Sequence, residues 1–496
     1  MQLQWERKQI PALGVKVWET QNQEQTLELR LGESMPDIGH IICAWGQPLL
    51  RTKEWQADRM QISGGVQVWV LYAPEDGSDP QCMEAWLPFQ IKWNLPETQR
   101  DGFIRCDVRL GGVDGRVLSA RKMLVRAQIS ALGQALEPET VICCVPEETP
   151  THIQLLRQTY PVRLLSEAGE KQIRLDEDLV LEAQPAAKII SNTVQPMLHE
   201  QQVVGGKAVF RGNCSVHVVY SLEDGMIHSE DHDIPFAQFA DLDKDFDKAA
   251  TLDTMLAVSD LESELIDGGL RLKCSVIAQY VVTEERLLET AQDAYSVENM
   301  LSLQMWEPEI PVILDACTDV RTAKQNDSQV HQPIIDACCF SEQPVLRKNG
   351  DSAQVQMPLL LQLLCRDADG QYVSSSVRFV EQWQLHASDN CHMMLRAVPS
   401  DAPKFAIAAD GMECSISLLV EMQSAVRQPL SMISAIEVGQ KFQADEARPS
   451  LILRRAGQDT LWQIAKNYGS TVDAIRTTNG IDDISSEQQM LLIPIS

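Results

Sequence analysis

Three segments decide the fold of this 496-residue chain: VQVWVLYAPEDG (residues 66–77), CSVHVVYSLEDG (214–225) and VQMPLLLQLLCRDADG (355–370). In each segment apolar and polar side chains tend to alternate with a period of two, which indicates a strand with one buried face. Each segment ends at a glycine preceded by acidic residues, the composition of a tight hairpin turn that needs a positive φ. The pattern therefore predicts three antiparallel hairpins.

The three segments belong to a repeat with a period of 148 residues. The tetrad Gln-Pro-X-Leu occurs at 47–50, 195–198 and 343–346, at equal intervals. Further alternating strand patterns follow each hairpin, at 122–130, 270–278 and 412–420. A fixed period indicates that one structural unit is repeated along the chain. We expect each unit to be an antiparallel β domain with few helices, either a sandwich or an open barrel.

The repeat predicts four domains. Their expected bounds are 20–150, 158–293 and 294–435 for the β repeats, 437–449 for a linker and 450–496 for a C-terminal module. The linker is predicted because its segment is polar and ends in Arg-Pro. The expected fold class is mainly β, with three repeated antiparallel β domains followed by a small β-α-α-β domain.

The C-terminal module shows two helix patterns between two short strands. Thr460, with Gln463 three residues later, predicts a capping box at the start of the first helix. The second helix is expected to begin at Ser470 or Thr471 and to end at Asn479-Gly480, which suit a left-handed cap. One apolar face of the first helix is formed by Leu461, Ile464, Ala465 and Tyr468.

This module resembles a LysM domain. The residues that carry the resemblance are Asp459-Thr460-Leu461-Trp462-Gln463-Ile464-Ala465, Tyr468-Gly469, Asn479-Gly480 and Leu491-Leu492-Ile493-Pro494. LysM domains as a family bind glycans that contain N-acetylglucosamine, such as peptidoglycan, and some bind proteins instead. By this resemblance, the expected partner- or glycan-binding residues are Gln458, Asp459, Thr460, Trp462, Asn479, Gly480, Ile481 and Asp482.

Three β repeats with one terminal LysM-like module resemble the SPOCS-domain spore coat proteins of spore-forming Firmicutes, in particular the coat adaptors of clostridia. In that family the LysM domain contacts the ATPase that polymerises as the coat basement around the forespore, and the β repeats support coat localisation. The resemblance implies a non-enzymatic adaptor in sporulation and spore coat assembly that works by protein–protein interaction. Its implied partners are the coat ATPase and other coat proteins. The alternative is a cell-wall or cortex protein whose LysM domain binds peptidoglycan.

The module departs from the usual LysM pattern in two places. Gln458 replaces the glycine before Asp-Thr, with Gly457 displaced by one, and Glu487-Gln488 replace the Pro-Gly before the final strand. Glycines in such loops let the backbone approach a ligand closely. We therefore expect weak peptidoglycan binding or none.

Trp462 lies on the shoulder of the first helix, about 100° around the axis from Leu461. One interpretation is that its ring packs along the edge of the module's core. The other is that part of the ring stays exposed beside Thr460 and residues 479–482 and anchors a protein partner, because tryptophan is enriched at interface hot spots.

The chain is acidic, with 70 Asp and Glu against 42 Lys and Arg. This charge disfavours nucleic-acid and membrane partners. The start MQLQWERKQIPALG shows no signal pattern, and no apolar run approaches the roughly 18 residues that span a bilayer. We expect a cytoplasmic protein of the mother cell, at the forespore surface or in the spore coat.

The candidate chemical sites favour structural roles. The 13 cysteines sit mostly in apolar runs without a CxxC pair, which predicts reduced, buried thiols. His228 and His232 have metal-ligand spacing only on a helix, and a solvated charged loop is favoured. Cys143-Cys144, Cys338-Cys339 and Cys391-His392 lack an oriented base. No catalytic site, metal or cofactor is expected, and the chain is not expected to be an enzyme.

One dense basic stretch is formed by Arg116, Arg121, Lys122 and Arg126. These residues protect a strand edge or contact an acidic partner.

Overall fold

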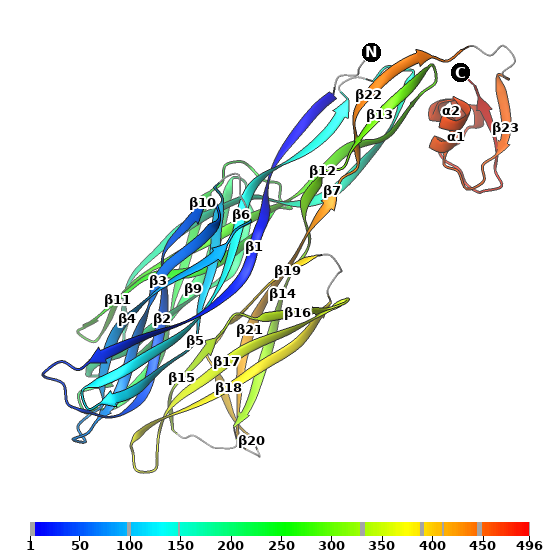
Figure 1. Cartoon of the computed structure of the whole chain (residues 1–496). Coiled ribbons are helices and arrows are strands. Elements are labelled where there is room, and N and C mark those ends of the chain that lie inside the picture. Colours follow the sequence, from blue (N-terminus) through cyan, green and yellow to red (C-terminus); the bar gives the residue numbers. More distant parts are fainter. Residues whose placement is uncertain are drawn as a thin grey trace.

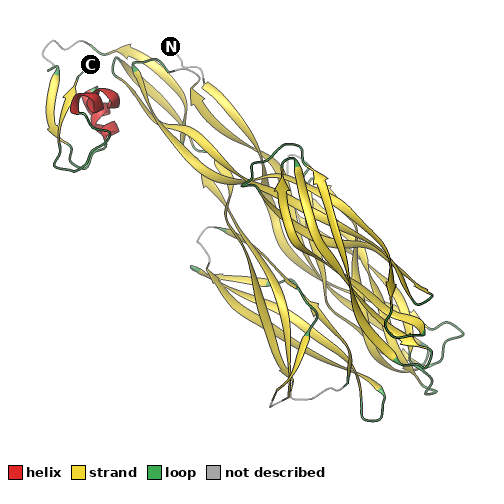
Figure 2. Cartoon of the chain, turned by 180° about the vertical axis from the view of Figure 1, so that it is seen from behind, coloured by secondary structure: helices red, strands yellow, loops and turns green. Residues whose placement is uncertain are grey.

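The computed structural model describes residues 5–96, 101–146, 149–327, 333–386, 391–408, 411–443 and 449–495. These residues form antiparallel strands, apart from two short helices close to the C-terminus (Figures 1 and 2). The mainly β class is confirmed.

The first β unit consists of two three-stranded sheets. Its strands are β1 (Trp5–Arg30), β2 (Ile38–Gln56), β3 (Arg59–Pro74), β4 (Gln81–Asn94), β5 (Phe103–Ser119) and β6 (Lys122–Pro146). One sheet has the order β2-β3-β4, and the other has the order β1-β6-β5.

The second unit repeats this topology. Its strands are β7 (Ile153–Val180), β8 (Ala186–Val204), β9 (Lys207–Leu222), β10 (Ile227–Asp241), β11 (Thr251–Ile266) and β12 (Gly269–Ser296). Its sheets have the orders β8-β9-β10 and β7-β12-β11.

The third unit follows the same plan, but four of its six strands are divided in two. Its strands are β14 (Glu309–Asp327), β15 (Ile334–Ser341) with β16 (Val345–Asn349), β17 (Ser352–Arg366), β18 (Tyr372–His386), β19 (His392–Pro399) with β20 (Lys404–Ala408), and β21 (Gly411–Pro429). Strands β15, β16 and β18 pair with β17, and β14, β19 and β20 pair with β21. The predicted threefold repeat of an antiparallel β domain is confirmed.

The hairpin turns lie where the sequence predicts them. Gly77, Gly225 and Gly370 have φ values of 74°, 81° and 78°. Each donates its N–H to the carbonyl three residues earlier. A side chain clashes with the backbone in this left-handed conformation, which explains why glycine recurs at the turn.

The first and last strands of each unit form a long antiparallel stem (Figure 1). In the third unit, β13 (Asn299–Trp306) and β22 (Met432–Lys441) pair with each other and extend the ladder of β14 and β21. A buried cluster joins Val141 of the first stem, Leu164 and Leu288 of the second, and Ile310 and Met432 of the third. The three units therefore pack together into one body rather than forming separate domains along the chain.

The strand limits lead us to propose somewhat different domain bounds. The outer strands pair to their ends, since Trp5 pairs with Pro146 and Ile153 with Ser296. The predicted linker begins inside β22, where Val438 pairs with Leu301. Residues 444–448 of that linker lie outside the described residues. In place of 20–150, 158–293 and 294–435, we propose units at 5–146, 153–296 and 299–441.

The C-terminal module comprises β23 (Leu451–Arg455), α1 (Leu461–Tyr468), α2 (Val472–Asn479) and β24 (Met490–Pro494). Thr460 and Gln463 form the predicted capping box, and Thr471 caps α2. The helices end at Gly469 and Gly480, whose φ values are 60° and 61°. These caps confirm the predicted β-α-α-β arrangement. Across the described residues, none of the helices is both long and apolar enough to cross a membrane.

Candidate functional site

Helix α1 of the C-terminal module packs on the stem of the second unit. The indole Nε1 of Trp462 donates a hydrogen bond to Oδ2 of Asp293 on β12, at 2.8 Å. The ring of Trp462 meets Tyr295 in a T-shaped contact, with 4.8 Å between centroids. Tyr295 donates its hydroxyl proton to the carbonyl of Ser470 at 2.9 Å, and Lys466 Nζ lies 2.7 Å from Oδ1 of Asp293. We name this contact between α1 and the end of β12 the seat of the module.

The seat holds Asp293 in its charged form. Burial alone would raise the pKa of this carboxyl group. The hydrogen bonds from Lys466 and Trp462, together with the charge of Lys466, outweigh that effect and hold the pKa below its usual value. The ionised carboxylate therefore stabilises the docked position.

Trp462 is half-buried, and its polar edge points to the stem. This position agrees with the interpretation in which the ring packs at the edge of the core, because Tyr295 belongs to the same buried cluster as Leu461 and Ile464. A role of Trp462 in binding a partner stays a prediction.

Thr460 and Asn479 have structural bonds within the module. Thr460 Oγ1 accepts from the N–H of Gln463 at 3.2 Å. Asn479 Nδ2 donates to the carbonyl of Leu492 at 2.7 Å, and its Oδ1 accepts from the N–H of Leu492 at 2.8 Å. The amide of Asn479 thus ties the end of α2 to β24.

The remaining predicted residues lie on two loops. Gln458 is exposed and Asp459 forms an ion pair with Arg454. On the second loop, Gly480 and Asp482 are exposed and Ile481 is half-buried. In the described part of the chain, no hydrogen bond or ion pair joins residues 458–460 to residues 479–482. The structure therefore brings these residues into one module but not into direct polar contact.

The two departures from the LysM pattern lie next to each other. Gly457, which has a φ of 65°, donates its N–H to the carbonyl of Glu487 at 2.9 Å. The neighbouring Ala456 donates to the carbonyl of Gln489 at 2.8 Å. The loop before α1 and the loop before β24 are thus hydrogen-bonded to each other, and each carries one of the two changes.

A second candidate site, which sequence reasoning missed, lies where the three β units meet. Gln47 accepts a hydrogen bond at 2.8 Å from a backbone N–H of the second unit. Gln195 donates to a carbonyl of the third unit, and Gln343 donates to a carbonyl of the first at 3.1 Å. The recurring glutamines of the tetrads therefore link the units in cyclic order, and the recurrence of the tetrads was the signal that singled out these residues.

One buried carboxylate joins all three units. Asp336 of the third unit accepts from Trp45 Nε1 of the first at 2.7 Å and lies 2.6 Å from His217 Nε2 of the second. His217 also contacts Asp231 at 2.7 Å. Burial alone would lower the pKa of His217, but the two carboxylates raise it to about 10, so the imidazole is charged at neutral pH.

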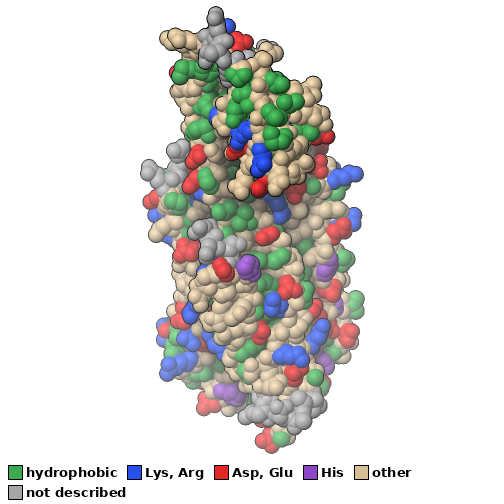
Figure 3. All heavy atoms as spheres, turned by 90° about the vertical axis from the view of Figure 1, so that its right-hand side faces the viewer, with side chains coloured by type: hydrophobic (Ala, Val, Ile, Leu, Met, Phe, Trp, Pro, Cys, Tyr) green, Lys and Arg blue, Asp and Glu red, His purple; other side chains and the backbone are tan. Residues whose placement is uncertain are grey.

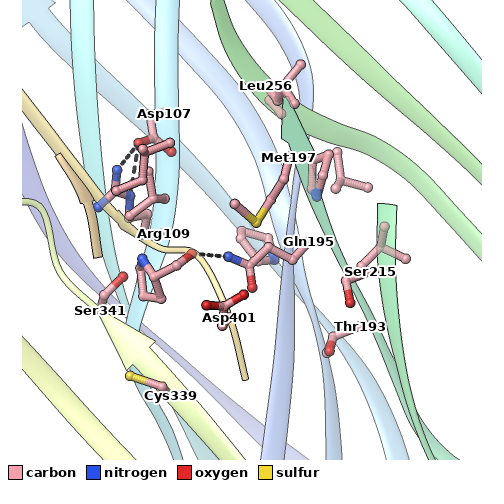
Figure 4. A pocket seen from close by; sticks show the side chains of 18 of the residues that line it. Asp107, Arg109, Thr193, Gln195, Met197, Ser215, Leu256, Cys339, Ser341 and Asp401 are labelled. Atoms are coloured by element: carbon pink, nitrogen blue, oxygen red, sulfur yellow. Dashed lines mark hydrogen bonds and ion pairs between the residues drawn. The ribbon is translucent and has the colours of Figure 1, made fainter. Parts of the chain in front are cut away.

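A pocket with a volume of about 510 Å³ opens at this junction (Figure 4). Among its charged residues, Asp107 and Arg109 are bonded to each other, and Gln195 donates to the carbonyl of Pro399 (Figure 4). Cys339 also lines the pocket, but burial raises the pKa of its thiol to about 12, which keeps it protonated. The arrangement supports a structural junction rather than covalent chemistry.

The structure also places the histidines and cysteines that the sequence suggested as candidate sites. His228 and His232 lie on strand β10, so the predicted loop is wrong; four residues along a strand separate them by about 13 Å. No cluster of potential metal ligands is present among the described residues. The cysteines are free, and most are buried.

The basic stretch lies on the hairpin of β5 and β6, and three of its four residues form ion pairs within the first unit. Arg121 contacts Asp37, Lys122 contacts Glu28, and Arg126 contacts Asp114.

Comparison with known families identifies two parts of the chain. Residues 185–266 match the family model described as SipL, SPOCS domain, and residues 458–491 match the LysM domain. The first match runs from the start of β8 to the end of β11 in the second β unit. No curated protein and no solved structure matched the chain.

The SPOCS match relates the protein to sporulation, and the LysM match adds a module of the peptidoglycan-binding type. Both are binding domains rather than catalytic ones. The chain thus combines a SPOCS domain of the SipL type with a C-terminal LysM domain, the architecture that its sequence resembles.

Proposed function

We propose that this protein is a non-enzymatic adaptor of spore coat assembly. In this proposal the LysM module docks on the ATPase of the coat basement and the β units engage other coat components. The adaptor acts in the mother-cell cytoplasm, at the forespore surface or in the coat.

The observation that carries the proposal is the seat of the LysM module. Trp462 and Lys466 fix α1 to Asp293, so the module sits at one end of an elongated body (Figure 1). The three β units form one packed body, and their stems run up to the module (Figure 1). A small binding module mounted on a large packed body suits a protein that joins two assemblies.

A pull-down from sporulating cells tests the proposal, with the full chain and with a chain that lacks residues 450–496 as baits. We expect the full chain to recover the coat ATPase and the shortened chain not to, whereas both chains should recover other coat proteins. Recovery of the ATPase by the shortened chain would contradict the assigned role of the module.

Peptidoglycan binding is the second candidate function, because the LysM match favours it. Under the adaptor proposal the changed loops at Gln458 and Glu487-Gln488 weaken this binding. Co-sedimentation of the full chain with purified sacculi separates the two functions. Micromolar binding that disappears when residues 450–496 are removed would favour the cell-wall role.

A further inference from the structure

We propose that the outer face of the β23–β24 sheet binds a protein surface that presents a carboxylate beside apolar side chains. This inference rests on the proposed function, since it specifies the face with which the LysM module docks on its protein partner.

The face consists of three cross-strand pairs. These are Leu451 with Pro494, Leu453 with Leu492, and Arg455 with Met490. The exposed fractions of Leu451, Leu453, Met490 and Leu492 are 48%, 62%, 50% and 36%. The opposite face carries Ile452, Leu491 and Ile493, which pack against the helices. Both sides of the sheet therefore carry apolar side chains, and among the described residues only one side is covered, by the helices.

The exposed face points away from the body of the protein. Helix α1 sits on the stem through Trp462 and Lys466, and Figure 1 shows the helices between the stem and β23. Figure 3 looks at this side and shows hydrophobic side chains beside basic ones on the module at the top. A partner can thus reach the face while the seat stays closed.

The charge of the face selects the chemistry of the partner. Within the described residues Arg455 has no ion pair, and neither β23 nor β24 contains an Asp or Glu, in a chain with 70 such residues. A guanidinium at the end of an apolar stripe is complemented by a carboxylate with its own apolar neighbours.

Two other occupants fit this face less well. A glycan needs several polar groups to bond its hydroxyls, whereas Arg455 is the one polar side chain among the six that form the three pairs. A second copy of the chain would bring leucines together but would offer no acidic side chain from the same face to either Arg455. A protein partner that presents a carboxylate beside apolar side chains complements both Arg455 and the exposed leucines of the face.

The experiment measures binding of the purified coat ATPase to the full-length chain by isothermal titration calorimetry. Leu453→Asp and Arg455→Glu should each weaken binding at least tenfold, because they remove an apolar anchor or reverse the selecting charge. Arg455→Lys keeps the charge and should stay within about threefold. The matched control is Leu287→Asp on β12, whose leucine is 73% exposed and lies outside the face; it should bind like the unchanged chain.

The outcomes separate this inference from the proposed function. If the unchanged chain binds and Leu453→Asp binds equally well, the inference is overturned while the adaptor role stands. A photo-crosslinking residue at position 453, compared with one at 287, covers the case in which the ATPase does not bind at all. That case refutes the ATPase role. Absence of any adduct at 453 in sporulating cells, or an adduct that persists in Arg455→Glu, then overturns the inference as well.

Discussion

Replacement of Trp462 by phenylalanine should loosen the seat of the LysM module while leaving the module folded. The change keeps an aromatic ring against Tyr295 but removes the Nε1–H that bonds Asp293 at 2.8 Å. A hydrogen bond to a charged group contributes about 1.5–3 kcal/mol. The ratio of docked to undocked module should therefore fall by about tenfold to a hundredfold.

Hydrogen–deuterium exchange of the α1 amides, residues 461–468, measures this loss. These amides exchange when the module opens, and docking adds to the free energy of that opening. Trp462→Phe and Asp293→Ala should each reduce protection, and the double variant should lose less than the sum of the two. Trp306→Phe, on the exposed strand β13, is the matched control and should leave α1 protection unchanged. Additive losses for the pair would refute a direct Trp462–Asp293 interaction.

Three further predictions concern the body and the module. The free energy of unfolding should fall as pH rises from about 6.5 to 10, because His217 titrates near 6.5 in the unfolded chain and at about 10 in the folded one. In urea titrations, the His217→Gln variant should lose this dependence on pH. Equal slopes of unfolding free energy against pH for the two chains would contradict the charged contact of His217 with Asp336 and Asp231. Gly370→Ala should destabilise the chain by about 1–2 kcal/mol through its φ of 78° alone, since nothing lies within 4 Å of the added Cβ. The control Gly32→Ala has equal space and no positive φ, so it should leave the stability unchanged. Equal urea midpoints for the two variants would contradict the left-handed conformation of Gly370. Purified sacculi should retain the full chain weakly or not at all in co-sedimentation, and micromolar retention would show that the loops at Gln458 and Glu487 still admit a glycan.

Local patterns predicted the β units well because they depend on neighbouring residues. The period of two fixes which side of a strand is buried, and a glycine after acidic residues fixes the turn, as Gly77, Gly225 and Gly370 show. The same holds for the LysM module, where Thr460 and Gly480 determine the ends of the helices.

The assembly of the units depended on contacts that the sequence does not encode locally. Gln343 bonds a carbonyl 236 positions away, and Asp336 meets Trp45 at a separation of 291. The spacing of the tetrads revealed the repeat but gave no direction in space for their side chains. The same limit applies to Trp462, since its helical position predicts a shoulder of the helix but not that Asp293 of another domain lies beside it.

The central claim, that the LysM module joins this β body to the coat ATPase, is tested most directly by sedimentation velocity with the two purified proteins. The account predicts a saturable complex between the ATPase and the full chain, and none with the chain that lacks residues 450–496. Equal complexes with both chains, or no complex with either, would contradict it.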